Sequence, residues 1–205
     1  MRGFSEAEKE QIRQKLFEVG CELFGTYGLK KTGIREIARA VGISQGAFYL
    51  FFPSKEALYF AILEREEEKI KTRLLETAMK EESSGFERVK NLLLEGLKLV
   101  YENKIVRRLY MEKEYMPKFP LELLENHNKR DLYDLTPLVD AWAREGIIRP
   151  EKPELIAGMI RAFFLLPIHQ REIGKDVFSE TMEKLAESIA LYLTTGAEKG
   201  EAHRD

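Results

Sequence analysis

Apolar residues recur along most of the chain at the three- and four-residue spacing of amphipathic helices. In the first stretch, four aliphatic residues fall on one helix face: Ile12, Leu16, Val19 and Leu23. Ser5 and Glu8 before them have the spacing of a capping box, and Gly28 is of the type that commonly ends a helix. No alternating β-branched run of strand length and no Asn-Gly or Asp-Gly hairpin interrupts the pattern. The pattern therefore predicts an all-α fold.

Caps and breakers divide this pattern into about nine helices. A short second helix follows Thr32, whose side chain we expect to cap it, and Gly42 permits a tight turn after it. A third helix runs from a cap at Ser44 to about residue 51, and a fourth runs from a cap at Ser54 to about residue 82. Five further helices are expected at about 86–102, 104–115, 121–145, 154–172 and 176–195. Pro167 is expected to kink the helix at 154–172.

Charge is distributed unevenly along the 205 residues. The chain has 33 Lys and Arg against 35 Asp and Glu, a formal net charge of −2, which argues against binding nucleic acid through bulk positive charge. Residues 1–55, however, hold nine basic and six acidic residues and carry +3, whereas the remainder carries −5. If the chain binds an anionic partner, residues 1–55 are the segment where we expect it to bind.

Several classes of protein are excluded by what the sequence lacks. Cys21 is the only cysteine, so no intrachain disulfide can form. No stretch approaches the roughly 20 apolar residues of a membrane span, and the N-terminus has no apolar signal region, so we expect a cytoplasmic protein without a membrane partner. Glycine-rich phosphate loops, nucleophile elbows and zinc-protease motifs are absent, and no histidine follows a glutamate at the three-residue spacing of di-iron bundles. We therefore expect no enzyme activity, no cofactor and no metal.

The short second and third helices have the pattern of a helix-turn-helix. Six apolar residues would bury them against the first helix: Ile34, Ile37, Ala38, Ile43, Ala47 and Phe48. Gln45, Gly46 and Tyr49 then point outward, with Leu50 beside them. An outward glycine costs a helix about 1 kcal/mol relative to alanine. This cost is explained if the helix backbone must approach a partner closely, such as a DNA groove or a phosphate.

The run Thr32–Leu58 resembles the signature of TetR-family transcriptional regulators, and Leu23–Gly28 resembles the phrase that ends the first helix in that family. The resemblance extends over about residues 9–69. It implies a helix-turn-helix DNA-binding domain at residues 1–55 and a larger helical domain at 56–205 that binds an effector and forms the dimer. The implied partners are double-stranded DNA, a second copy of the chain and a small molecule.

The resemblance also implies which residues contact DNA: Thr32, Arg35, Ser44, Gln45, Gly46, Ala47, Tyr49 and Lys55. Thr32, Tyr49 and Lys55 would contact phosphates. Gln45 would lie in the major groove with the two residues after it, where its amide could pair with adenine. Three basic residues would add charge along the DNA backbone: Lys30, Lys31 and Arg35.

Each of these assignments competes with a simpler interpretation. Tyr49 could be a packing tyrosine, Lys55 a solvated lysine in the first turn of its helix, and Gln45 a polar residue suited to a capped helix start. Phe51 departs from the family pattern, because many members have histidine or another polar aromatic residue there. A DNA contact from the Phe51 side chain is therefore not expected.

The last two predicted helices carry more apolar residues than one face needs, which the resemblance explains by dimerisation. The residues expected at the dimer interface are Ile160, Phe164, Met182, Leu185, Ile189 and Leu193. A second set of bulky and polar residues would line an effector pocket: Tyr101, Tyr110, Met111, Tyr115, Trp142, Met159, Phe163 and His169. Ordinary core packing is the alternative for both sets.

The sequence thus predicts a dimeric DNA-binding regulator. The more specific prediction is a repressor that a small apolar or amphipathic molecule releases from a near-palindromic operator. Two alternatives stay open. The regulator could be controlled by a protein partner, or the chain could be a nucleoid-associated or structural protein that binds DNA with little sequence preference.

Overall fold

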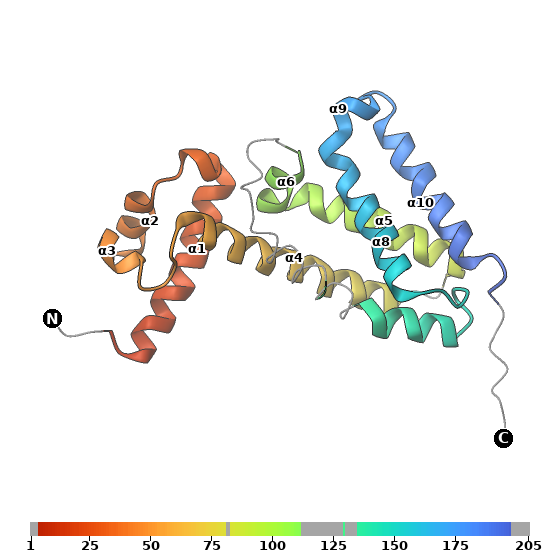
Figure 1. Cartoon of the computed structure of the whole chain (residues 1–205), viewed down its shortest axis with the longest axis horizontal. Helices are drawn as coiled ribbons and strands as arrows, with labels where there is room; N and C mark the ends of the chain where they lie inside the picture. Colours follow the sequence, from red (N-terminus) through yellow and green to blue (C-terminus); the bar gives the residue numbers. More distant parts are fainter. Residues whose placement is uncertain (1–3, 81–82, 112–128, 130–134, 198–205) are drawn as a thin grey trace, which may run out of the picture. The chain divides into compact units, whose positions relative to one another are not determined.

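The structure, a computed structural model, describes residues 4–80, 83–111, 129 and 135–197 (Figure 1). Every regular element among these residues is a helix, so the predicted all-α class is confirmed. The chain divides into two compact units. The first comprises the described parts of residues 1–69 and 101–117, and the second the described parts of 70–100 and 118–205.

The first unit is built around helix α1. Its elements are α1 (Glu6–Lys31), α2 (Ile34–Val41), α3 (Gln45–Phe48), the first part of α4 (Lys55–Lys80) and α6 (Lys104–Met111). Its fully buried side chains include Leu16, Phe24, Ile37, Phe48 and Leu58. Because α4 and α6 pack on α1, this unit extends beyond the 1–55 segment expected from the sequence and reaches Lys69, where the family resemblance also ends.

Two glycines and one arginine set how α1 packs. A Cβ on Gly20 would lie 2.7 Å from Cδ1 of Ile62, so a larger residue there would force the Ile62 side chain of α4 to shift. Gly28 has φ 80° and ψ 164°, which breaks the helical backbone where the sequence predicted it. The guanidinium of Arg108, on α6, donates to the carbonyl oxygens of Gly25 and Thr26 at 2.9 and 2.8 Å. The last full turn of α1 is thereby held by α6.

The predicted caps of the first helices are confirmed, with one exception. The Ser5 hydroxyl accepts from the Glu8 amide while the Glu8 carboxylate accepts from the Ser5 amide, as a capping box requires. The Thr32 cap was wrong. Gly33 is the N-cap of α2, because Thr32 is buried and its hydroxyl donates instead to the carbonyl oxygen of Gly28 at 2.8 Å.

The helix-turn-helix connection follows the prediction closely. Gly42 has φ 84° and ψ 27°, the left-handed conformation that a tight turn requires. The Ser44 hydroxyl accepts from the amide of Ala47 at 3.1 Å and caps α3. Helix α3 ends at Phe48, earlier than predicted, and the chain continues through residues 49–51 as a turn with i to i−3 hydrogen bonds.

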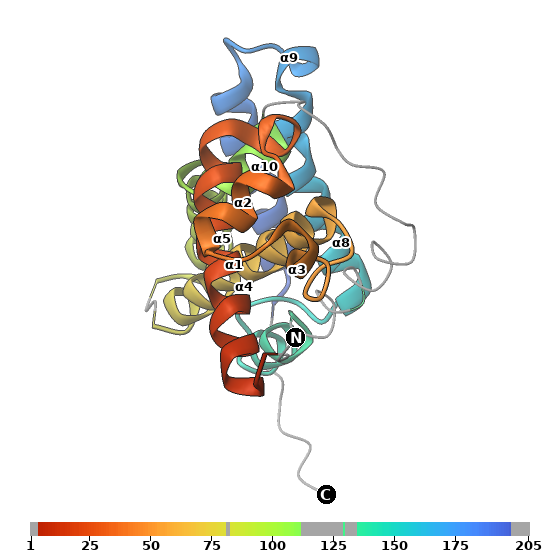
Figure 2. The ribbon, with the colours of Figure 1, turned by 90° about the vertical axis from the view of Figure 1, so that its left-hand side faces the viewer.

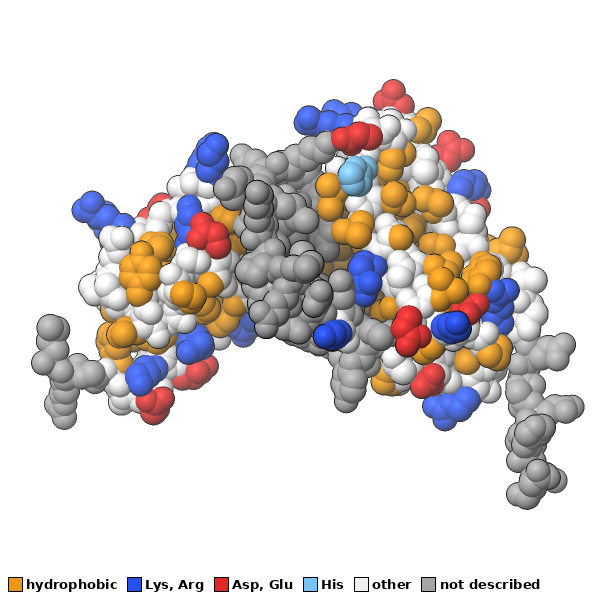
Figure 3. Space-filling view, in the orientation of Figure 1, with side chains coloured by type: hydrophobic (Ala, Val, Ile, Leu, Met, Phe, Trp, Pro, Cys, Tyr) orange, Lys and Arg blue, Asp and Glu red, His pale blue; other side chains and the backbone are white. Residues whose placement is uncertain are grey.

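The second unit packs the C-terminal helices on α5. Its elements are the end of α4, most of α5 (Gly85–Glu102), a helix at 135–144, α8 (Pro153–Leu165), the 3₁₀ turn η1 (Leu166–His169), α9 (Gln170–Ile173) and α10 (Phe178–Thr194). Pro167 lies in η1, so the helix expected at 154–172 is interrupted there, as its proline predicted. A Cβ on Gly96 would lie 2.6 Å from Cζ of Phe164, so this glycine lets the phenylalanine pack on α5. Figure 3 shows many apolar side chains at the surface over α8 and α10.

Candidate nucleic-acid interface

Helix α2 packs on α1, and α3 packs on α2 (Figure 2). Ile37 of α2 and Phe48 of α3 have no exposed surface. The amide of Ile43, in the turn between the two helices, donates to the carbonyl of Ala38 at 2.9 Å. The ring of Phe48 lies 6.3 Å from that of Phe52, which is also buried. With two anchored helices and a hydrogen-bonded turn, the outward side of α3 has a defined position within the unit.

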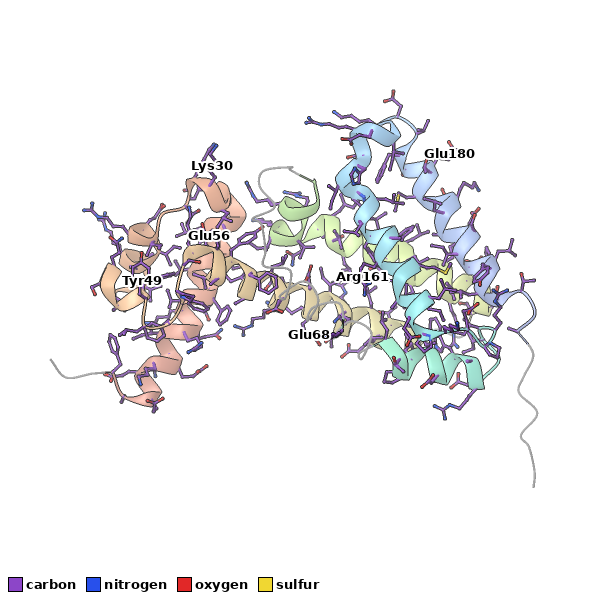
Figure 4. All side chains as sticks on the ribbon, viewed as in Figure 1. Lys30, Tyr49, Glu56, Glu68, Arg161 and Glu180 are labelled. Carbon is purple, nitrogen blue, oxygen red and sulfur yellow. The ribbon has the colours of Figure 1, made fainter. Side chains whose placement is uncertain are left out.

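The outward side of α3 carries the residues that the sequence placed there. Gln45 and Gly46 are exposed, and Ala47 is half-buried. Tyr49 follows at the end of α3 with 52% of its surface exposed (Figure 4), and its ring packs edge-on against Phe48 at 5.7 Å. Tyr49 therefore combines a fixed ring with a solvent-accessible side, which is the geometry that a phosphate contact needs.

None of the residues that the structure describes requires a glycine at position 46. A Cβ built there would find its nearest atom, the Ser44 hydroxyl oxygen, at 3.9 Å, which is ordinary van der Waals contact. Alanine would fit the fold here and favour the helix by about 1 kcal/mol, so the described residues give no packing reason for the glycine. A groove edge or phosphate brought against the α3 backbone supplies such a reason.

Exposed basic side chains flank this surface. Lys30 and Lys31 end α1, and Arg35 and Arg39 lie on α2, all four exposed (Figure 4 labels Lys30). Glu36 is the exposed acidic residue on α2. These cations are exposed to solvent, and the phosphate contacts of Lys30, Lys31 and Arg35 stay predictions.

Two residues predicted to contact phosphates have other roles in the structure. Thr32 is 0% exposed and its hydroxyl donates into the end of α1, so its side chain does not reach the surface. Lys55 donates from its ammonium to the carbonyl oxygens of Leu29 and Thr32 at 2.8 and 3.0 Å, with that of Lys30 at 3.5 Å. These carbonyls at the C-terminal end of α1 lack helical partners, and a cation there also complements the helix dipole. Lys55 thus caps α1 from the first turn of α4.

The departure from the family pattern at Phe51 has a packing explanation. Phe51 is half-buried, and its ring centroid lies 6.2 Å from that of Phe4, which precedes α1. An apolar side chain at position 51 therefore holds the segment before α1 against the turn after α3. This agrees with the expectation that Phe51 makes no polar DNA contact.

The residues predicted at the dimer interface divide into two groups. Met182 and Leu193 are 1% and 3% exposed within this chain, so they belong to its own core and the prediction for them was wrong. The other four are half-buried: Ile160, Phe164, Leu185 and Ile189. The exposed large hydrophobic residues of these helices are different ones, namely Leu155 and Leu165 on α8 and Leu191 and Tyr192 on α10. A helix that is apolar all round does not reveal which side its own core covers.

The predicted effector residues occupy varied environments. Trp142 and Phe163 are buried in the core of the second unit, Met159 is half-buried, and His169 is exposed. Tyr101 belongs to the first unit, where burial raises the pKa of its phenol. Tyr115 and the side chains of Tyr110 and Met111 lie outside the described residues. The effector pocket therefore stays a prediction.

A cleft of about 560 Å³ that the sequence did not indicate lies in the first unit, between α1, α4 and the start of α6. Its lining includes Phe17, Cys21 and Glu66. Burial raises the pKa of the Cys21 thiol, and the nearby Glu66 carboxylate raises it further. The thiol is therefore held in its protonated, weakly nucleophilic form.

Two negative findings concern the described residues. None of their helices has the length and apolar character needed to cross a bilayer. No group of three or more His, Cys, Asp and Glu side chains among them is placed to hold a metal ion.

Comparison with known proteins points to one family. Residues 16–62 match the family model described as "Bacterial regulatory proteins, tetR family". The HTH-type transcriptional regulator YuxN of Bacillus subtilis is 36% identical over 96 residues, which are 47% of this chain and 30% of that protein. The nucleoid occlusion factor SlmA of Haemophilus ducreyi is 31% identical over 101 residues, 49% of this chain and 50% of that protein. The HTH-type transcriptional regulator AcrR of Shigella flexneri is 33% identical over 106 residues, 51% of this chain and 48% of that protein. The matches thus cover no more than half of these relatives.

Solved structures resemble the whole chain in fold. A putative TetR-family regulator from Syntrophomonas wolfei has a TM-score of 0.67 at 20% identity, covering 94% of this chain and 100% of that one. A TetR-family regulator from Pectobacterium atrosepticum has a TM-score of 0.68 at 18% identity, covering 92% and 95%. AibR, solved in complex with isovaleryl coenzyme A and operator DNA, has a TM-score of 0.50 at 19% identity, covering 89% and 98%. Residues 16–62 therefore match the helix-turn-helix domain of tetR-family regulatory proteins, and the chain has the helical fold of the solved members of that family.

Proposed function

We propose that the chain is a dimeric transcriptional repressor that reads a near-palindromic operator with α3 and is released by a small apolar or amphipathic molecule. The observation that carries the DNA-reading part is the outward side of α3. There, exposed Gln45 and Tyr49 flank Gly46, a glycine that the fold itself does not require. The match of residues 16–62 to the tetR family model also supports DNA binding through α3.

Within this proposal the contacts have separate roles. Tyr49 and the exposed cations Lys30, Lys31 and Arg35 bind phosphates and set the register of the protein on the duplex. Gln45 pairs its amide with an adenine edge in the major groove. Gly46 lets the α3 backbone come close to the DNA. Thr32 and Lys55 act indirectly, by holding the end of α1 on which α2 and α3 rest.

The DNA experiment is selection of bound sequences from a random duplex library by the full chain. We expect one palindromic consensus with half-sites about one helical turn apart. Tyr49→Phe should weaken binding to all sequences, whereas Gln45→Ala should relax preference at one position of each half-site. Lys175→Ala, which changes an exposed lysine of the second unit, is the control and should leave binding unaltered. An unchanged consensus with Gln45→Ala would contradict the assignment.

Dimerisation is proposed through the exposed apolar side of α8 and α10. Leu155 and Leu165 lie ten residues apart on α8, so they are about 80° apart around the helix and bound one side of it. Gly158 and Ala162 lie between them, and a Cβ on Gly158 would meet no atom within 4 Å. Small residues flanked by leucines give a flat apolar face that a second copy can cover, with exposed Leu191 contributed by α10.

The oligomeric state tests this face directly. Sedimentation of the wild-type chain should give a dimer, and Leu165→Glu should give a folded monomer because the charge would be buried in the interface. Lys175→Glu is the matched control, since it places a carboxylate at an exposed position outside the face. A Leu165→Glu variant that sediments as a dimer would refute this interface.

Release by a small molecule is supported by the likeness to AibR, which was solved with both isovaleryl coenzyme A and operator DNA. A coupling of about 1–3 kcal/mol between the two sites would weaken operator binding roughly 5- to 150-fold. Native mass spectrometry of the chain purified from its own host tests this part. Retention of a small molecule whose addition lowers operator affinity is the expected result, and operator affinity unaffected by any retained compound would oppose it.

A second function is favoured by the likeness to SlmA, which is named a nucleoid occlusion factor. On that reading the chain binds DNA with little sequence preference as part of chromosome organisation. The selection experiment separates the two functions. The second would be supported if the selected sequences had no consensus and if DNA affinity depended only on salt concentration.

A further inference from the structure

Leu50 has an exposure that the fold does not explain. It is 73% exposed, the highest value among the large apolar residues that the structure describes. The residues on either side of its turn are buried, since Phe48 is 0% and Phe52 is 7% exposed. Leu50 therefore contributes little to the core, although it stands between two core residues.

The position of Leu50 is fixed by the backbone around it. Its amide donates to the carbonyl oxygen of Ala47 at 3.1 Å, and the next amide, of Phe51, donates to that of Phe48 at 3.0 Å. These bonds continue the helical winding for one turn beyond α3. In a winding with i to i−3 bonds, residues three apart share a face, so Leu50 lies over Ala47 and directly follows the exposed Tyr49.

Leu50 is therefore an apolar projection just beyond α3, next to the small side chain of Ala47. The rest of this face is polar or small, with Gln45 exposed and Ala47 half-buried. In the major groove the base edges are hydrogen-bond donors and acceptors, except for the C5-methyl group of thymine. If this surface enters the major groove, the thymine C5-methyl group is the apolar group on the base edges that an exposed leucine can contact.

We propose that Leu50 contacts the C5-methyl group of a thymine in each operator half-site and so is a specificity-determining residue. The inference rests on the proposed DNA-reading function and adds to it a base that Gln45 does not read. Removing one buried methyl group from the contact corresponds to a loss of about fourfold in affinity per half-site. Because the dimer reads two half-sites, the loss with both substituted is about fifteenfold.

Replacement of thymine by deoxyuridine tests the contact, because it removes only the methyl group. Operator duplexes with one symmetric pair of thymines replaced at a time are titrated with the full chain, and affinity is measured by fluorescence anisotropy. One pair should lower the affinity of the wild type about fifteenfold. With Leu50→Ala the same pair should cost less than twofold, whereas Leu50→Met, which keeps an apolar side chain, should retain most of the penalty.

Tyr49→Ala is the matched control, since it alters the neighbouring exposed side chain. It should weaken all duplexes alike and leave the deoxyuridine penalty in place. Thermal melting of Leu50→Ala should match the wild type, because the side chain is largely solvated.

The outcomes separate the inference from the function on which it rests. A selected operator that is bound tightly, but with no deoxyuridine penalty or with one that persists in Leu50→Ala, would overturn the thymine contact and leave the repressor function standing. Failure of the wild type to select any operator would overturn both.

Discussion

Replacing Lys55 by methionine removes the ammonium that caps α1 while keeping a side chain of similar length. In the structure the ammonium donates to the carbonyl oxygens of Leu29 and Thr32 at 2.8 and 3.0 Å. Because these donors come from α4 and the acceptors from the end of α1, the bonds join segments that are more than 20 residues apart in sequence. Loss of the ammonium leaves the carbonyls to water and removes a positive charge from the C-terminal end of a helix.

The size of the effect follows from the number and setting of these bonds. A hydrogen bond from a charged group contributes about 1.5–3 kcal/mol net when well formed. The carbonyls here are only part-buried, so water partly replaces the ammonium, and we expect a total loss of about 1–2 kcal/mol. For a chain of this size that corresponds to a fall in melting temperature of roughly 2–8 °C. Lys31→Met is the control, because it removes an exposed positive charge from the same helix end and should change the melting temperature little.

Salt dependence of operator binding distinguishes this capping role from a phosphate contact. Each lysine that neutralises a phosphate contributes about 0.9 to the slope of log affinity against log salt, hence about 1.8 for a dimer. We expect Lys55→Met to weaken operator binding with an unchanged slope, since its ammonium is bound to carbonyls within the protein. A slope reduced by about 1.8 with an unchanged melting temperature would refute the capping role and restore the phosphate contact that the family resemblance implies.

Three further predictions concern single positions. Gly46→Ala should raise stability by up to about 1 kcal/mol, seen as a higher melting temperature, yet weaken operator binding, because the fold has room for the methyl group and the DNA does not. Gly85→Ala should lower the melting temperature by several degrees, because a Cβ there would lie 2.4 Å from the carbonyl oxygen of Ile147, and unchanged melting would contradict this packing. The Cys21 thiol should react with iodoacetamide more slowly at pH 8 than in the urea-unfolded chain, since burial raises its pKa. In the folded chain the rate of this reaction should keep rising as the pH passes the ordinary thiol pKa. Equal reaction rates in the folded and unfolded chains would contradict the raised pKa.

The sequence by itself determined the features that depend on neighbours within one helical turn. The capping of α3 by Ser44, the left-handed turn at Gly42 and the break at Gly28 were all predictable. Each involves a backbone preference or a hydrogen bond over about three residues, so no distant part of the chain is needed to specify it. The same holds for the outward positions of Gln45 and Gly46, because the spacing of apolar residues assigns the faces of short helices.

The tertiary structure alone decided the features that join distant segments or divide a continuous apolar surface. Lys55 has the sequence context of a solvated first-turn lysine or a phosphate contact, and only the packing of α4 against α1 shows the carbonyls that it caps. Met182 and Leu165 are both apolar residues in amphipathic patterns, yet one is buried in the core and the other exposed. Their difference depends on which side of each helix the rest of the unit covers. Periodicity states that a face is apolar, whereas burial depends on what packs against it.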